Sequence, residues 1–143
     1  MKTVSTIARY LLGLIFTVFG LNGFLNFIPA SPVPPLAGQF IGALIQSHYM
    51  TVVFVLELAC GLLLLANRYV PLALTTLAPI IVNIVLVHVF LAPAGLPLAA
   101  VVVLLWGLQI QRLRHVFSAI FEQSANPAFA HGNRVPGSAP LRA

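Results

Sequence analysis

The sequence predicts an all-α fold, in which four transmembrane helices form a bundle and one further helix lies between the first two spans. Of the 143 residues, 60% are hydrophobic and only 6% are charged, whereas a soluble domain carries about 25% charged residues. The charges are also widely spaced: none occurs between Arg9 and Glu57, and none between Arg68 and Arg112. Charge-free apolar stretches of this length are typical of transmembrane segments.

Four apolar runs are candidates for the spans. The first covers about 7–28 and ends before a proline-rich turn at 29–35, because proline cannot continue a helix. The others cover about 51–66, 70–92 and 98–113. The turn at Pro93–Pro97 separates the last two, and basic residues follow the second and fourth spans.

The segment 36–50 is too short and too polar on one side to be a regular span. Apolar residues such as Phe40 and Ile41 are set against Gln39, Gln46 and His48, which favours an interfacial or re-entrant helix. We assign 1–121 to one transmembrane domain. The remainder, 122–143, is rich in Pro, Gly, Ala and Asn, and we expect a disordered cytoplasmic tail.

The basic residues set the expected orientation. Lys2, Arg9, Arg68, Arg112 and Arg114 flank alternate ends of the four spans, and the other connections carry no Lys or Arg. The positive-inside rule therefore predicts a multi-pass protein of the cell inner (plasma) membrane with both termini in the cytoplasm. These residues mark the ends of apolar runs rather than a basic face, so the bilayer is the expected partner and nucleic acid is not.

Small residues and a proline indicate how the helices pack. Gly20 and Gly61 would let neighbouring helices approach closely, and Pro79 should kink the third span. The single cysteine, Cys60, excludes an intrachain disulfide and is read as a packing residue.

Glu57 is the residue around which we build a candidate site, because a carboxyl group in hydrocarbon is costly unless it is protonated or hydrogen-bonded. At 1.5 Å per residue, Asn22 and Glu57 lie about 9 Å below the outer surface, Asn83 about 13 Å and His88 about 6 Å. Asn26 lies near that surface. We expect a polar pocket that opens outward, with Glu57 and His88 as candidate catalytic proton carriers. The ligand-binding candidates are Asn22, Asn26 and Asn83.

A structural role is the alternative for the same residues, since Asn and His commonly hydrogen-bond across helices and so stabilise a bundle. No metal site is expected, because His88 has no ligating partner four residues away. The sequence also contains no glycine-rich phosphate loop, no nucleophile elbow and no axial histidine pair suited to haem.

Four segments, 9–24, 57–65, 70–74 and 78–84, together with His88, resemble the DoxX-like family of small four-helix membrane proteins. The similarity runs from about 7 to 118. Carried over by motif are Gly20, Asn22, Glu57, Gly61, Pro79, Asn83 and His88. The resemblance implies a four-helix bundle, and the family name derives from a subunit of an archaeal thiosulfate:quinone oxidoreductase. Relatives often hold an acidic residue near the position where this chain has Gln109. This departure from the family pattern puts a mechanism with two carboxylates in doubt.

The resemblance implies a membrane subunit tied to quinone or sulfur redox chemistry, an oxidoreductase subunit that acts with a partner subunit or a quinone. Quinone is the only cofactor candidate, and the sequence encodes none of its own. The alternative is a non-catalytic binding or scaffold protein whose pocket takes a lipid, a quinone or a partner's helix. The candidate partners also include a partner subunit or a second copy in a homo-oligomer. A small transporter is less favoured, because the short chain contains no repeat for alternating access.

Overall fold

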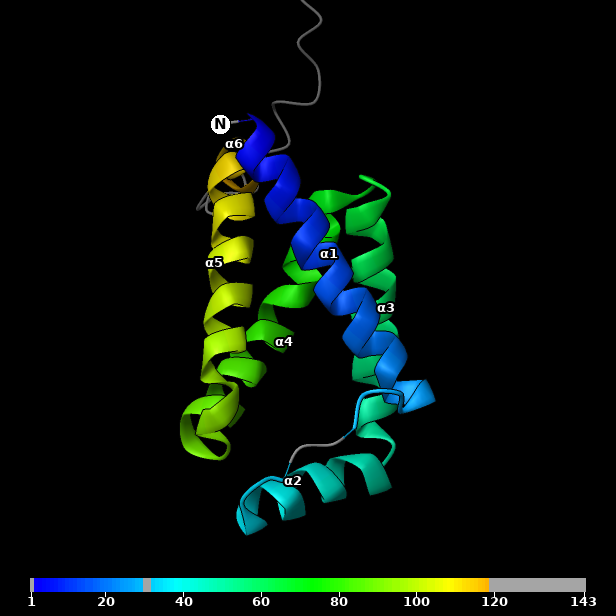
Figure 1. Ribbon diagram of the computed structural model, residues 1–143. Coiled ribbons are helices and arrows are strands. Elements are labelled where there is room, and N and C mark those ends of the chain that lie inside the picture. Colours follow the sequence, from blue (N-terminus) through cyan, green and yellow to red (C-terminus); the bar gives the residue numbers. More distant parts are fainter. Residues whose placement is uncertain (1, 30–31, 119–143) are drawn as a thin grey trace, which may run out of the picture.

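The computed structural model describes residues 2–29 and 32–118, and every regular element in these ranges is a helix. Figure 1 labels the helices along the chain. In chain order they are α1 (Lys2–Leu25), α2 (Pro35–Gln46), α3 (Tyr49–Leu65), α4 (Val70–Phe90), the 3-10 turn η1 (Pro93–Gly95), α5 (Leu96–Arg112) and the short α6 (Arg114–Phe117). The predicted tail at 122–143 lies outside the described residues.

Three helical segments are long and apolar enough to cross a membrane: Thr3–Leu25, Val70–Phe90 and Pro93–Arg112. The 17 residues of α3 form a fourth crossing only if α3 is counted with α2, from which it is bent by 84°. The all-helical class is therefore confirmed. The four-span arrangement with a separate interfacial helix stays a prediction.

The first helix begins at Lys2 rather than near 7. The C-terminal ends of two helices also differ from the predicted boundaries by three residues or more, and asparagine or histidine in the left-handed region explains both. The first helix ends at Leu25 rather than near 28, because Asn26 has φ 50°. The side chain of Asn22 stabilises this end, since its Oδ1 accepts a hydrogen bond of 2.7 Å from the backbone N–H of Ile28. Likewise α2 ends at Gln46, and His48, with φ 60°, turns the chain into α3.

Glycines bring α1 and α3 into close contact along most of their length. A Cβ atom on Gly20 would lie 2.6 Å from the backbone nitrogen of Leu58, and one on Gly61 would lie 2.6 Å from that of Thr17. Both distances are shorter than any side chain allows, so these positions require glycine. The predicted packing role of Gly20 and Gly61 agrees with this geometry.

The hydrophobic core lies between α1, α3, α4 and α5. Its fully buried side chains include Leu12, Phe16, Leu64, Leu74 and Leu77.

Pro79 lies inside α4, as predicted, and the helix continues through it to Phe90. One turn before this proline, the carbonyl oxygen of Leu74 accepts a hydrogen bond of 3.0 Å from Trp106 Nε1 on α5. Since a proline interrupts the regular hydrogen bonding of a helix, this bond ties α5 to a weakened part of α4.

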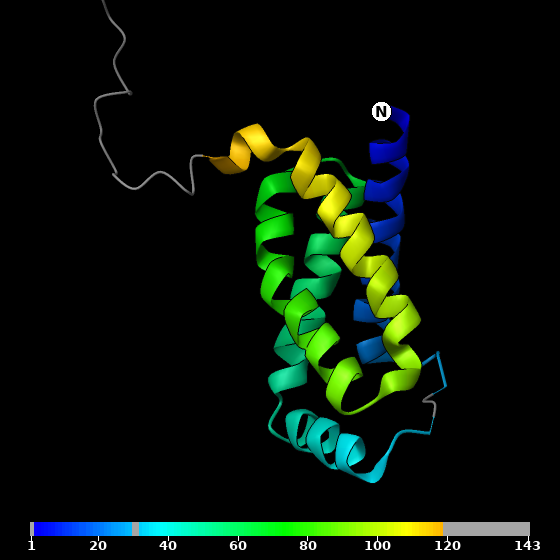
Figure 2. The ribbon, with the colours of Figure 1, turned by 90° about the vertical axis from the view of Figure 1, so that its left-hand side faces the viewer.

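The two ends of the bundle differ in chemistry. The start of α1, the α3–α4 turn, the end of α5 and α6 lie together at one end, whereas α2 crosses the opposite end in both views (Figures 1 and 2). The first of these ends carries all of the described arginines, Arg9, Arg68, Arg112 and Arg114. We call it the basic end.

Arg9 differs from its expected place at an aqueous helix end. Its side chain is only 7% exposed, and its terminal nitrogen NH1 donates to the carbonyl oxygens of Leu64 and, at 3.5 Å, Leu65. Both carbonyls lie at the end of α3, where the regular hydrogen bonds of the helix stop, and that of Leu64 also accepts a bond of 3.2 Å from the backbone N–H of Asn67. The guanidinium therefore caps α3 from within the bundle.

Candidate functional site

A cavity of about 480 Å³ lies at the end of the bundle that α2 crosses, and residues of α1 to α5 line it. The polar side chains in its wall are Asn22, Asn26, Thr51, Glu57 and His88. The wall residues from α5 are apolar, namely Leu98, Ala99 and Val102. The structure thus brings four of the five predicted catalytic and ligand-binding residues to one cavity.

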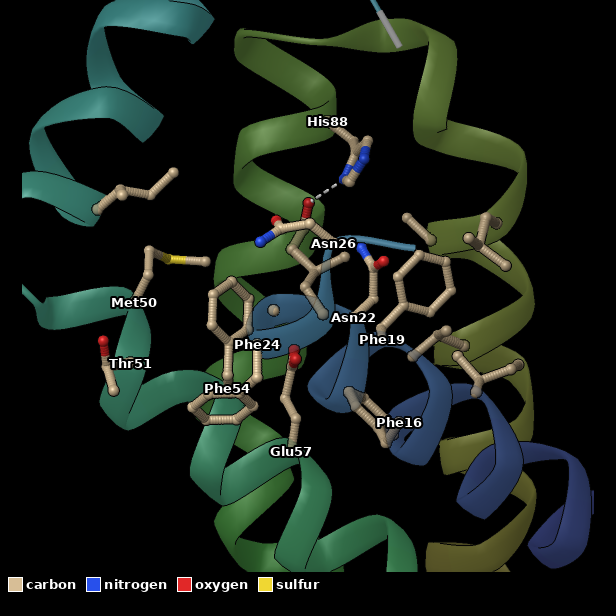
Figure 3. Close-up of a pocket in the computed structure, with 17 residues that line it drawn as sticks. Phe16, Phe19, Asn22, Phe24, Asn26, Met50, Thr51, Phe54, Glu57 and His88 are labelled. Atoms are coloured by element: carbon tan, nitrogen blue, oxygen red, sulfur yellow. Dashed lines mark hydrogen bonds between the residues drawn. The ribbon is translucent and has the colours of Figure 1, made fainter. Parts of the chain in front are cut away.

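Glu57 lies at the middle of α3 and directs its carboxyl group into this cavity (Figure 3). The side chain is 7% exposed. No group among the described residues donates a hydrogen bond to this carboxyl group or forms an ion pair with it. Its oxygens are nevertheless not fully enclosed, because Thr17 Oγ1 is the only fully enclosed side-chain N or O atom without a partner in the described residues. The carboxyl group therefore faces open space in the cavity.

Phenyl rings surround the carboxyl group. Phe24 and Phe54 meet edge to face, with ring centroids 6.2 Å apart and an interplanar angle of 69°. The ring of Phe54 lies directly against Gly23, where no side chain could fit. Phe16 is buried on the opposite side of Glu57 (Figure 3). These rings give the cavity an apolar wall in which a hydrogen bond to Glu57 would meet little competition from water.

Asn22 and Asn26 come from the end of α1 and occupy the wall farther from Glu57 (Figure 3). Since Asn22 Oδ1 already accepts the bond from Ile28, the amide group that remains for a ligand is a donor. Asn26 lies in the left-handed turn that follows α1. The positions of both residues depend on how α1 ends.

His88 stands near the last turn of α4, and its orientation is fixed on two sides. Its Nδ1 lies 2.7 Å from the carbonyl oxygen of Ile84, and because a carbonyl only accepts, Nδ1 carries the proton. The other edge of the ring rests on Gly95, where a Cβ atom would overlap it. In the neutral imidazole Nε2 is then an acceptor, the opposite character to the Asn22 amide.

Asn83 does not join the cavity, contrary to the sequence-based expectation. Its side chain is exposed on the bundle surface, and its Nδ2 donates a hydrogen bond of 3.0 Å to the carbonyl oxygen of Pro79. Asn83 precedes His88 by five residues, which corresponds to about 140° around a helix. The polar side chain that faces the cavity from α4 is therefore His88, and Asn83 donates instead to the carbonyl of Pro79.

Sequence reasoning did not identify Thr51 and the phenyl rings as cavity residues. In an apolar helix, the phenyl groups that line a cavity have the same pattern as those that contact lipid, so periodicity does not separate them. Within the described ranges, no three His, Cys, Asp or Glu side chains come together in a way that could hold a metal ion.

Comparisons of the chain with protein-family models, with curated proteins and with solved structures found no match. The resemblance to the DoxX-like family therefore rests on the four sequence segments alone. Membership of that family stays a hypothesis, and the geometry of the cavity is the main support for a function.

Proposed function

We propose that this protein binds a small, uncharged amphiphile from the membrane, and that Glu57 is the group that recognises its polar end. The observation that carries the proposal is the carboxyl group of Glu57, which faces an aromatic-walled cavity of about 480 Å³ without a partner among the described residues. Buried polar groups are normally hydrogen-bonded. A carboxyl group left free in such a place is suited to a ligand.

The wall chemistry favours a ligand with a ring and oxygen substituents. The volume falls within the range of about 300–1,000 Å³ that is usual for small-molecule sites. The phenyl rings would stack on a flat ring, while Glu57 and the Asn22 amide would reach oxygen atoms at its edge. A quinone has these features, and it is also the cofactor that the resemblance to the DoxX-like family implies.

Redox chemistry is the further step of this proposal. In a quinone-linked subunit, Glu57 and His88 would exchange the protons that accompany reduction or oxidation of the ring. We place the source of the electrons on a partner subunit. By the positive-inside rule the cavity would open to the outer side of the membrane, so these protons would be exchanged there.

The test compares two variants of Glu57. Glu57→Gln keeps the shape of the side chain and its ability to donate and accept hydrogen bonds. We therefore expect the purified variant to retain the ligand, while any proton-linked activity is lost. Glu57→Leu should lose the ligand but fold normally, because no described group depends on the carboxyl for a hydrogen bond. Mass spectrometry of the co-purified small molecules, alongside reversible unfolding in mixed micelles, measures both effects.

The matched control is Asn83→Leu, which changes a polar residue on the bundle surface outside the cavity. It should leave ligand retention unchanged. A Glu57→Leu protein that is as stable as the wild type and still carries its ligand would refute the proposed role of Glu57.

A non-catalytic scaffold is the second candidate, and the apolar character of most of the cavity wall favours it. A lipid acyl chain would fill such a cavity with Glu57 left as a neutral neighbour. In that case only bulk phospholipid would co-purify, and Glu57→Leu would bind it at least as well as the wild type.

A further inference from the structure

The basic end of the bundle, on the side away from the cavity, contains two arginines with unused hydrogen-bond donors. Arg9 is 7% exposed, and its hydrogen bonds, to Leu64 and Leu65, use only NH1. On α5, Arg112 donates through NH1 to Ser5 Oγ at 2.8 Å. A guanidinium carries five N–H donors. Each of the two side chains therefore keeps several donors free of any partner among residues 2–29 and 32–118.

A buried polar network holds the guanidinium of Arg112 in place, while the end of α3 holds that of Arg9. Gln109 Nε2 donates to the carbonyl oxygen of Ser5 at 2.6 Å, and Ser5 Oγ lies 3.5 Å from Gln109 Oε1. Ser5 and Gln109 are 7% and 1% exposed. Because Ser5 precedes Arg9 by four residues, the two lie on the same face of α1. The network thus fixes Arg112 beside the first turns of α1. Arg9, which bonds to the carbonyls of α3, comes one turn further along the same face of α1.

The positive charge at this place has no acidic partner in the part of the chain that the structure describes. No ion pair forms among the described residues, in which Glu57 is the only acidic side chain. Glu57 lies seven residues from Leu64 along α3, or about 10 Å. The ring of Tyr10, 4.3 Å from Arg9 Cζ, and the carbonyl end of α3 offset part of the charge of Arg9. A buried cation without a counter-charge nevertheless remains unfavourable.

The free donors of Arg9 can still be reached from outside. Thr17 Oγ1 is the only fully enclosed side-chain N or O atom without a hydrogen-bond partner in the described part of the chain. The unpaired nitrogens of Arg9 are therefore not sealed in the core. Arg112 is exposed at the same end, so an anion could contact one guanidinium at the surface and the other at depth.

We propose that Arg9 and Arg112 together bind the phosphate group of an anionic phospholipid in the leaflet at the basic end. Guanidinium groups form charge-assisted, often bidentate hydrogen bonds with phosphate. Basic sites between transmembrane helices commonly take anionic headgroups. A membrane lipid is favoured over a soluble anion because both arginines lie near one end of helices long enough to cross a membrane: Arg112 ends α5, and Arg9 follows the first two turns of α1. The acyl chains would then cover the apolar outer face of α1, where Ile7 and Leu11 are exposed.

The experiment measures thermal unfolding of the full chain in mixed micelles that contain phosphatidylglycerol or phosphatidylcholine, with native mass spectrometry to count bound lipids. We expect phosphatidylglycerol, and not phosphatidylcholine, to raise the unfolding temperature of the wild type. Arg112→Gln can keep a hydrogen bond to Ser5, so it should fold, and it should bind phosphatidylglycerol about tenfold more weakly. Arg9→Lys keeps the charge but loses the planar guanidinium that can form two hydrogen bonds with one phosphate, so it should also weaken the binding of phosphatidylglycerol.

Two exposed arginines at the same end, Arg68 and Arg114, supply matched controls. Arg68→Gln and Arg114→Gln should leave the affinity for phosphatidylglycerol within about twofold of the wild type. An equal loss in these controls would overturn the proposal in favour of a general attraction by positive charge. Stabilisation by inorganic phosphate alone, to the same degree, would identify a soluble-anion site and would also overturn it.

Glu122, the second acidic residue of the chain, lies outside the described residues and provides the last comparison. If a lipid phosphate is the counter-charge, Glu122→Gln should respond to phosphatidylglycerol as the wild type does. A response that appears only in Glu122→Gln would show that the chain supplies its own counter-charge, against the proposal. None of these outcomes depends on the ligand of the cavity near Glu57.

Discussion

The imidazole of His88 is held between two backbone groups, and this arrangement determines what it offers to a ligand. The Ile84 carbonyl fixes the proton on Nδ1, and Gly95 leaves only enough room for the ring edge. A side chain held in this way loses little freedom when it binds, which favours affinity. Gly95 is therefore a positioning residue for His88, although it carries no chemistry itself.

Gly95→Ala should displace the imidazole, because the added methyl group would overlap the ring. Overpacking of this kind typically costs about 1–3 kcal/mol. In a His88→Ala background the same change should cost almost nothing, since the overlapping partner is gone. Equilibrium unfolding of the four proteins of this double-mutant cycle measures the coupling. A coupling near zero would mean that the η1 turn is free to move away from the ring.

The grouping of Asn22, Glu57 and His88 at one end of the bundle was predictable, but the side of the helix on which each polar residue lies was not predictable for all of them. Counting residues from the helix ends groups Asn22, Glu57, Asn83 and His88 in one half of the bilayer. The count does not say which face of α4 points into the bundle, and Asn83 lies on the face that points away from it. That side depends on how α4 packs on α3 and α5, a property of the assembled bundle.

At the scale of helices, the contact between α1 and α3 is close and depends on glycine. A methyl group on Gly61 would approach Thr17 on α1 to 2.6 Å at the backbone nitrogen, and Gly13 to 2.9 Å at the carbonyl oxygen. Neither backbone atom can move without separating the two helices. The cavity lies farther along the same pair of helices, so their spacing also sets its width.

Gly61→Ala should therefore destabilise the protein by about 1–3 kcal/mol, even though alanine is the better helix former. Gly107→Ala is the matched control, because Gly107 lies inside α5 with nothing within 4 Å of an added Cβ atom. That change should be neutral or stabilising by up to about 1 kcal/mol. Unfolding in mixed micelles compares the two, and equal effects would contradict the tight packing of α1 against α3.

The starts of α2 and α4 were easier to predict from the sequence than the ends of α1 and α2. Proline marks the starts of α2 and α4, where Pro35 and Pro71 occupy the first turns. The ends of α1 and α2 were predicted three to four residues too late, because they depend on left-handed residues at Asn26 and His48. Asparagine adopts that conformation readily, but it also occurs inside helices, so its presence alone does not identify a helix end.

For the whole molecule, composition and charge spacing were sufficient to predict an all-helical protein of membrane character, because a chain with so few charges cannot present a soluble surface. The polar network at the basic end was not predictable. Ser5 and Gln109, which this network joins, are separated by 104 residues in the sequence. The role of Arg9 as a cap also depends on where α3 ends beside α1. Contacts of this kind follow from tertiary packing and leave no periodic signal.

The orientation of the bundle is the last prediction, and it follows from the arginines at one end and their absence at the other. Between Arg9 and Arg68 and between Arg68 and Arg112 the chain passes α2 and η1 without any Lys or Arg. By the positive-inside rule, the basic end should face the cytoplasm and α2 the outer side. The cavity with Glu57 lies at the end that α2 crosses, so it should be reached from outside.

Cysteine labelling measures this orientation directly in intact cells. In a Cys60→Ala background, Pro32→Cys and Ala94→Cys place thiols at exposed positions near α2 and in η1, and a membrane-impermeant maleimide should label both without permeabilisation. Ser118→Cys, exposed just after α6 at the opposite end, is the control and should react only after the membrane is opened. The reverse pattern would place Glu57 on the cytoplasmic side and move the lipid proposed at Arg9 and Arg112 to the outer leaflet. Labelling of all three positions from outside would show that the two ends do not lie on opposite sides of the membrane, which would contradict the transmembrane arrangement itself.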